Sequence, residues 1–308
     1  MKRFILNTIL FSVVLLISFY VILLSADGYS DPFYLKFTTP KQNNLILGTS
    51  KAAQGLNPYV INEILDTEMY NYSFSINSSP YGIKYLESIK RKLSYKKVNG
   101  IFIVSVDSWS ISSLSKDPND IPIFRENNSC VGTLDVVDKN PNFSYLLKFM
   151  SGNYYKILHK QSVAKLHENG WLDVSLSLDS TSVYRRTKST LLGYEKYLST
   201  YNYSQVRFEY LIETIKFLNT YGNVYLVRLP TSVGLMKMEN QLIPNFNEKL
   251  KPAIEITSGY LDLADKNSDY KYTDGVHLSK NSGKLVSEEI SYWIKNIENA
   301  QTQNSTNN

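Results

Sequence analysis

Apolar runs of strand length alternate along this chain with segments of helical periodicity, and no other feature constrains its fold as strongly. The strand-like runs are LILG (45–48), MYNYSFS (69–75), GIFIVSV (100–106), VYLVRL (224–229) and YLDLA (260–264). Helical patterns fall at 58–67, in GIKYLESIKRKL, on the face formed by Phe208, Leu211, Ile212, Ile215 and Leu218, and on the face formed by Val286, Ile290, Trp293, Ile294 and Ile297. Strands that alternate with helices predict an α/β fold, in which a mainly parallel sheet lies between two helical layers.

Polar residues follow each of the five predicted strands. They are Ser50, the segment 73–77, Asp107, Arg228 and the sequence DGVH at 274–277. Parallel sheets bind their ligands at the carboxyl ends of the strands. The sequence therefore predicts a functional site at this edge of the sheet.

The N-terminus has a different character. Lys2 and Arg3 precede an uncharged run from Phe4 to Leu24, which in a helix is long enough to cross a bilayer core of about 30 Å. A cleavable signal sequence is the alternative, but it typically has an apolar region of only roughly 7 to 15 residues and a clearer cleavage site. We expect residues 1–26 to form an uncleaved single-pass anchor in a bacterial cytoplasmic membrane, with the rest of the chain outside the cytoplasm.

The rest of the chain divides into three parts. We expect a short stem at 27–43, one domain at 44–298 and a disordered polar tail at 299–308. Residues from about 109 to 203 interrupt the strand–helix alternation, so we interpret them as an insertion that forms a cap or a partner surface. Within it, we expect a helix near 143–158 and a hairpin strand in WLDVSLSLD (171–179).

Composition excludes some classes of function. With 43% hydrophobic and 20% charged residues the chain is globular, and its net charge of +5 is spread without a dense basic block, which disfavours nucleic-acid binding. Cys130 is the only cysteine, so no disulfide forms within the chain. His159 and His167 lack metal-ligand partners at useful spacing, and we expect surface or packing roles for both and no metal site.

The clearest chemical motif is TDGVHLSKNSG, residues 273–283. Asp274 and His277 stand three residues apart, so within one turn the carboxylate can orient the imidazole and stabilise its protonated form. We expect a helix to follow, capped by Ser279 or Asn281. Taken alone, Ser50 could be an ordinary helix N-cap, but together with this pair it becomes a candidate nucleophile.

GTS with Gly55 downstream, together with DGVH, resembles the first and last blocks of the SGNH/GDSL hydrolase superfamily, over roughly 44–297. The resemblance implies a serine hydrolase fold that uses neither a metal ion nor an organic cofactor. It also implies that Ser50 is the nucleophile, His277 the general base and acid, and Asp274 the residue that orients His277.

The middle blocks of the family match less closely. The resemblance implies an oxyanion donor at the backbone of Ser73, which stands in the family's glycine position in NYS. Asp107, in SVD, stands where the family has an asparagine donor, and an ionised carboxylate donates no hydrogen bond. We expect that Asp107 has moved to a structural or substrate-facing role; protonated Asp107, a donor from Asn77 and weak activity are the alternatives.

An anchored SGNH domain with a long insertion is similar to the proteins that assist O-acetylation of alginate or D-alanylation of teichoic acids. The resemblance implies transfer or hydrolysis of an acyl group on a cell-envelope carbohydrate, beside a multi-spanning acyltransferase. The alternative is a non-catalytic glycan-binding or scaffolding partner of such an enzyme, which the aspartate at 107 favours.

Several further residues are candidates for substrate contact. Arg228 could hold an anionic group over the site or form a surface salt bridge, whereas Lys51 and Gln54 fit solvated helix positions better than substrate contacts. In the insertion, the aromatic residues to test for glycan contact are Tyr154, Tyr155 and Trp171.

Overall fold

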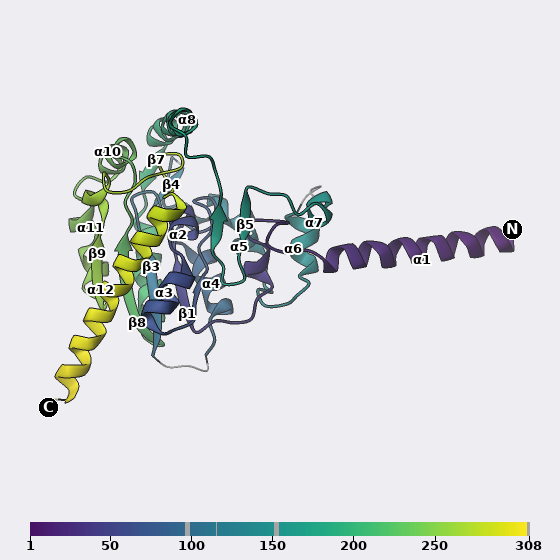
Figure 1. Ribbon diagram of the computed structural model, residues 1–308, viewed down its shortest axis with the longest axis horizontal. Helices are drawn as coiled ribbons and strands as arrows, with labels where there is room; N and C mark the ends of the chain where they lie inside the picture. Colours follow the sequence, from purple (N-terminus) through teal and green to yellow (C-terminus); the bar gives the residue numbers. More distant parts are fainter. Residues whose placement is uncertain (96–98, 115, 151–153, 307–308) are drawn as a thin grey trace.

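The computed structural model describes residues 1–95, 99–114, 116–150 and 154–306. These ranges form a mixed α/β domain with one long helix, α1 (Lys2–Leu24), projecting from it (Figure 1). The domain is built on a five-stranded parallel sheet in the order β2 (Met69–Asn71), β1 (Asn44–Leu47), β3 (Gly100–Ser105), β8 (Gly222–Arg228) and β9 (Gly259–Asp262). The mixed α/β class and the parallel sheet predicted from the sequence are thus confirmed.

The two faces of the sheet bury different residues of the same strands. Leu45 and Leu47 of β1 belong to one apolar cluster, whereas Ile46 belongs to another, because alternate side chains of a strand point to opposite faces. The first cluster includes residues of α4 (Ile83–Lys92), α9 (Gln205–Asn219) and α11 (Phe246–Ile254). The second includes residues of α2 (Ser50–Gly55), α3 (Pro58–Leu65) and α12 (Lys280–Thr306).

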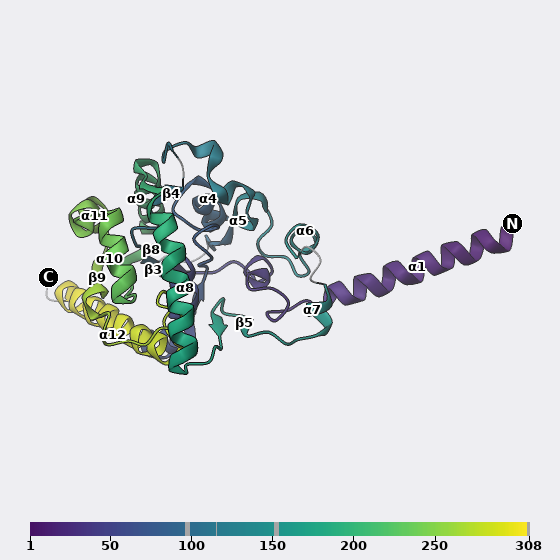
Figure 2. The same ribbon diagram turned by 90° about the horizontal axis from the view of Figure 1, so that it is seen from above.

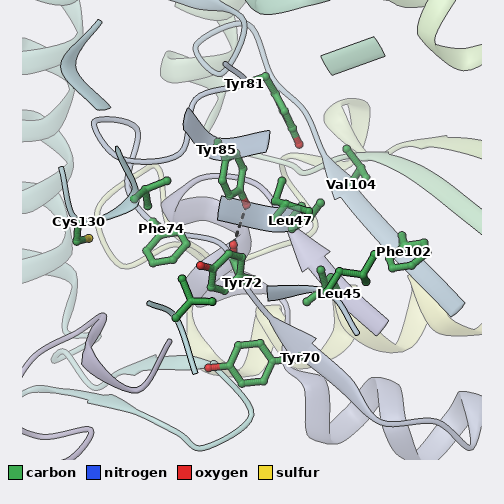
Figure 3. Close-up of a cluster of buried hydrophobic side chains, with 14 of the residues drawn as sticks. Leu45, Leu47, Tyr70, Tyr72, Phe74, Tyr81, Tyr85, Phe102, Val104 and Cys130 are labelled. Carbon is green, nitrogen blue, oxygen red and sulfur yellow. Dashed lines mark hydrogen bonds between the residues drawn. The ribbon is translucent and has the colours of Figure 1, made fainter. Parts of the chain in front are cut away.

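The first cluster is unusually aromatic (Figure 3). Tyr72, Phe74 and Tyr85 are fully buried in it, and the Tyr85 hydroxyl donates to the Tyr72 carbonyl at 2.7 Å. The helical faces expected from the sequence also pack as predicted. In α12, for example, Val286, Ile290 and Ile294 are fully buried at a spacing of four residues.

The segment 27–43, for which the sequence predicts a stem, is instead part of the domain core. Tyr34 and Phe37 of the 3-10 helix η1 (Tyr34–Phe37) are fully buried in the first cluster. Lys36 Nζ donates to the carbonyl oxygens of Asn71 and Ser73 at 2.7 and 2.6 Å. Burial of these aromatic side chains stabilises the folded protein, whereas a solvated stem would leave them exposed to water.

Helix α12 runs on to Thr306, through most of the 299–308 segment for which the sequence predicts disorder. This segment contains neither glycine nor proline, so nothing in it breaks the backbone hydrogen bonds of the helix. The structure is therefore helical, rather than disordered, up to Thr306.

The insertion contains several short elements and one long helix, α8. They are β4 (Ser112–Leu114), η2 (Ile121–Ile123), η3 (Arg125–Asn128), α5 (Cys130–Thr133), α6 (Phe143–Lys148), α7 (Tyr155–Leu158), β5 (Ala164–Leu166), β6 (Leu172–Val174), α8 (Ser180–Leu198) and β7 (Tyr201–Tyr203). The expected hairpin is present as the antiparallel pair β5–β6, whereas the expected helix at 143–158 is two helices, and 151–153 lie outside the described residues. Cys130 and Tyr145 are buried in the first cluster, so the insertion also builds the core.

The remaining elements are α10 (Val233–Leu242), which follows β8, and the 3-10 helix η4 (Ala264–Lys266). Helices α8 and α10 lie side by side in both views, at one end of the sheet, and α1 leaves the domain on the side of α6 and α7 (Figures 1 and 2).

Candidate active site

Ser50 stands at the junction of β1 and α2, as its first helical residue. Gly48 makes this junction possible: its φ of 148° is a conformation that L side chains rarely adopt, and an added Cβ would lie 2.9 Å from Ser105 Cβ. Thr49 occupies the N-cap position, without a side-chain capping bond. The Ser50 hydroxyl thus serves no N-cap role and is directed at another residue.

That residue is His277. The Ser50 Oγ lies 2.9 Å from His277 Nε2, and His277 Nδ1 lies 2.8 Å from Asp274 Oδ2. With Nδ1–H donating to the carboxylate, Nε2 is left to accept the serine proton. Two segments that are 227 residues apart in the sequence are therefore joined in one Ser–His–Asp relay.

The loop that carries Asp274 and His277 is held in place by its own backbone. Asp274 Oδ1 accepts the backbone N–H groups of Val276 and His277 at 3.0 and 2.9 Å. Burial raises the pKa of Asp274, but the hydrogen bonds and charge interaction with His277 outweigh it, so that its pKa lies below the usual value and the carboxylate stays ionised. Ser279, one of the two expected caps, accepts the Ser282 N–H at 3.3 Å at the start of α12.

Helix α8 of the insertion packs against this loop. Arg186 Nε donates to the Thr273 carbonyl at 2.8 Å. Gly275, with a φ of 85°, leaves room for Thr187, since an added Cβ would lie 2.9 Å from Thr187 Cγ2. The insertion thus covers part of the candidate site.

Lys51 does not occupy the solvated position that we expected from the sequence. Its side chain is only 5% exposed, and Nζ pairs with Asp107 Oδ2 at 3.0 Å and with Glu239 of α10. Burial lowers the pKa of Lys51, but the two carboxylates outweigh this effect and raise it, so the ammonium stays charged. The burial of three charged side chains beside Ser50 is offset by their pairing.

Asp107 has a structural role in this cluster. Besides the pairing of Oδ2 with Lys51, its Oδ1 accepts the Ser110 N–H at 2.8 Å, and the residue is 4% exposed. Both carboxylate oxygens are therefore occupied by protein donors. This arrangement agrees with a structural role for Asp107 rather than one in binding an oxyanion.

Arg228 is buried as well, so neither expectation for it matches the structure. Its guanidinium lies 3.6 Å from Glu239 and 3.7 Å from Asp262, and 4.4 Å from the centre of the Phe246 ring. With 5% exposure, Arg228 forms part of a buried ionic cluster rather than a surface salt bridge or an open clamp for an anion.

The other two oxyanion candidates are also engaged elsewhere. The Ser73 N–H donates to Asn71 Oδ1 at 3.1 Å, and the Ser73 hydroxyl to the Ile46 carbonyl at 3.2 Å. Asn77 is exposed, and its Oδ1 accepts from Arg125. The first turn of α2 offers different donors, because the N–H groups of Ser50 and Lys51 have no carbonyl four residues back within the helix.

An aromatic and apolar cluster adjoins the relay. Trp109 and Val276, which precedes His277, are buried there with Tyr201 and Leu235. Tyr194 of α8 packs edge-on to Trp109 with ring centroids 4.9 Å apart. Two residues of this region were not predicted from the sequence: Trp109, two residues after Asp107, and Glu239, which lies 188 residues from Lys51 and shows no local pattern.

The remaining candidates do not converge on the relay. Trp171 is buried and donates to the Gln54 carbonyl at 2.9 Å, while Tyr154 packs on α1 and Tyr155 is exposed. His167 stacks on Trp171, and His159 is exposed, as packing and surface residues. Among the described residues, no group of three or more His, Cys, Asp or Glu side chains is placed to hold a metal ion.

Comparison with known proteins adds no relative: no family model matches this chain, and no curated protein matches it with significant similarity.

Proposed function

We propose that this protein is an SGNH-type serine acyltransferase or esterase that acts on a cell-envelope carbohydrate. The observation that carries the proposal is the hydrogen-bonded relay of Ser50, His277 and Asp274 at the end of a parallel sheet. The order of the three residues along the chain is also that of the superfamily. Helices pack on both faces of the sheet, which supports the three-layer α/β/α arrangement of that superfamily.

The geometry supports a two-step reaction. His277 Nε2 takes the proton of Ser50 as Oγ attacks the acyl carbonyl, and Asp274 stabilises the resulting imidazolium. His277 then returns the proton to the leaving oxygen, which yields an acyl-serine. Water or a sugar hydroxyl attacks this ester and gives its proton to His277, which passes it to Ser50 Oγ as the serine leaves. Neither a metal ion nor an organic cofactor takes part.

The oxyanion of each tetrahedral intermediate needs donors in place of those that the family uses. The backbone N–H groups of Ser50 and Lys51, at the start of α2, are the donors nearest to the nucleophile in the chain. The buried pairing of Lys51 with Asp107 and Glu239 supports this role, because it fixes the backbone of the residue that follows the nucleophile.

The apolar helix α1 supports a membrane location, since it is long and apolar enough to cross a bilayer once. We place the domain on the outer side of a bacterial cytoplasmic membrane, where the acceptor is an envelope polysaccharide or polyol. A multi-spanning acyltransferase in the same membrane supplies the acyl donor in this proposal.

A second candidate is a non-catalytic glycan-binding or scaffolding protein. The specific observation in its favour is that the family's two middle-block donor positions do not supply donors in the expected way: Asp107 is a carboxylate, and the Ser73 N–H is bonded to Asn71. Loss of one oxyanion donor typically slows such enzymes about a hundred-fold to a thousand-fold.

A fluorophosphonate probe, which reacts with activated serines, distinguishes the two candidates. We expect the full chain to be labelled and Ser50→Ala not to be labelled. Ser232→Ala is the matched control, because Ser232 lies near Gly275 and its buried hydroxyl has no hydrogen-bond partner among the described residues. Equal labelling of Ser50→Ala and wild type, or no labelling of wild type, would contradict the nucleophile assignment.

A further inference from the structure

Helices α6 and α7 lie beside the last turns of α1 (Figures 1 and 2). Tyr154, just before α7, packs edge-on to Phe19 with ring centroids 5.8 Å apart, and Phe143 of α6 stacks on Tyr20 at 5.6 Å. Phe19 and Tyr20 precede the end of α1 by four to five residues, which is about 6 to 8 Å along the helix axis. If α1 spans a bilayer, α6 and α7 are therefore at the depth of the lipid headgroups.

No flexible linker separates α1 from the domain. Leu23, in the last turn of α1, and Ala26 are buried in the first cluster, with 3% and 8% exposure. Two residues further on, the Gly28 carbonyl accepts the Leu166 N–H at 2.8 Å. The domain consequently begins at the membrane surface, and its face around α1 has to meet the lipid.

That face exposes large apolar side chains. We define the α6–α7 patch as Leu147, Tyr155 and Leu158, whose exposed fractions are 61%, 60% and 63%. The Tyr154 hydroxyl donates to the Leu146 carbonyl at 3.0 Å, which holds α6 and α7 together. Apolar side chains exposed to this degree are unfavourable in water but not in contact with lipid.

The charges around the patch suit an anionic membrane surface. Residues 143–165 contain Lys148, Lys156, Lys160 and Lys165 and no acidic residue. Lys160 pairs with Asp27 at 2.6 Å, whereas Lys148 is exposed and forms no ion pair with any residue that the structure describes. Lysines beside exposed tyrosine and leucine side chains are typical of segments at a membrane interface.

We propose that the α6–α7 patch inserts into the headgroup region of the bilayer that α1 spans, and that anionic lipids favour this contact. The protein then touches the membrane at two places, through a spanning helix and through a peripheral patch. Two contacts fix the orientation of the domain relative to the membrane plane. The Ser50 site is then held at one height above the membrane, because the domain does not tilt with α1.

Site-directed labels in the full chain test this proposal. Leu158→Cys and Leu147→Cys, made together with Cys130→Ala and labelled with an environment-sensitive fluorophore, are reconstituted in vesicles of phosphatidylcholine and phosphatidylglycerol. Tyr184→Cys on α8 and Tyr292→Cys on α12, 68% and 58% exposed, are the matched controls. We expect both patch labels to shift to shorter emission wavelength and to be quenched several-fold more strongly than the controls by a lipid spin-labelled near the headgroup.

Two results would overturn the proposal. Patch labels that behave like the controls would show that the patch faces water. Shielding that depends on the ratio of protein to lipid, without quenching by the spin-labelled lipid, would show that a second copy of the chain covers it. Probe labelling of Ser50 is measured on the same vesicles, so a failure of this proposal is distinguished from a failure of the proposed chemistry.

Discussion

Lys51, the residue next to the candidate nucleophile, carries a buried charge that is paired with two carboxylates. Its partners are the buried side chains of Asp107 and Glu239, while its backbone lies in the first turn of the helix that presents Ser50. Removing one member of a buried ion pair leaves the others without compensation, which typically costs about 3 to 5 kcal/mol. The sequence alone places this lysine on a helix surface, because its two partners, on the loop after β3 and on α10, are distant in the sequence.

We therefore expect Lys51→Met to lower the free energy of unfolding of the detergent-solubilised protein by about 3 to 5 kcal/mol and to slow fluorophosphonate labelling of Ser50. Denaturant unfolding and labelling rates measure the two effects. Lys84→Met is the control, since the pair of Lys84 with Glu87 is partly exposed and should contribute about 1 kcal/mol or less. Equal effects of the two substitutions would argue against a buried ionic cluster.

A second buried lysine predicts how stability depends on pH. Burial lowers the pKa of Lys92 to about 7, and its Nζ donates to the carbonyls of Thr39 and Val137 at 2.6 and 2.9 Å. The unfolded chain, with an ordinary lysine pKa of about 10.4, binds more protons than the folded protein between these two values. Stability due to Lys92 must therefore rise with pH from about 7 upwards.

The measurement compares the wild type with Lys92→Met by denaturant unfolding of the solubilised protein. Relative to the variant, the wild type should gain about 2 kcal/mol in free energy of unfolding between pH 7 and pH 9. The other two buried lysines, Lys36 and Lys51, are present in both proteins, and the part of the lowering of the Lys36 pKa that is due to the Lys92 charge is counted with Lys92. Parallel curves for the two proteins would show that Lys92 keeps an ordinary pKa in the folded state.

At the scale of elements, helix α8 packs closely against the loop with Asp274 and His277 at Gly275. Gly275→Ala places a side chain at a positive φ and close to Thr187, and a left-handed conformation alone costs a residue about 1 to 2 kcal/mol. We expect the variant to be less stable and to label more slowly at Ser50. Adding Thr187→Ser removes the methyl group that the new Cβ meets, and should restore part of both losses.

A double-mutant cycle with Gly275→Ala and Thr187→Ser isolates this coupling. Additive effects of the two substitutions would show that positions 275 and 187 have no interaction free energy, and that α8 and the loop are not coupled at this point. Thr190→Ser, one turn further along α8, serves as a control that removes a methyl group elsewhere on the same helix.

Some elements could be predicted from the sequence, and others depend on tertiary contacts. Runs such as GIFIVSV predict buried parallel strands because every residue of β3 is covered on both faces, and Ser50 and DGVH follow strands of the same sheet. The division of 143–158 into α6 and α7 does not follow from the apolar pattern, although Gly152 and Asn153, between the two helices in the sequence, are poor helix formers. Glu239 could not be found either, since its charge pairs only through tertiary contact.

At the scale of the whole molecule, the domain begins before its first strand. The sequence predicts a boundary at residue 44, because the aromatic and polar segment 27–43 has no helical or strand period. In the structure Tyr34 and Phe37 fill the core beside β2, and the buried Lys36 ammonium bonds to the backbone of Asn71 and Ser73. Burial of large aromatic side chains contributes about 1.5 to 3 kcal/mol each.

This difference predicts where the chain can be cut. A fragment of residues 27–308 retains Tyr34, Lys36 and Phe37, and we expect it to unfold cooperatively and to react with the fluorophosphonate probe at Ser50. A fragment of residues 44–308 loses these side chains and leaves a cavity against β2, so it should aggregate or resemble a molten globule in near-ultraviolet circular dichroism. Phe37→Ala in the longer fragment provides the graded control, with an expected loss of about 3 to 5 kcal/mol. Equal stability of the two fragments would mean that the segment before β1 is a stem after all, and that the core closes without it.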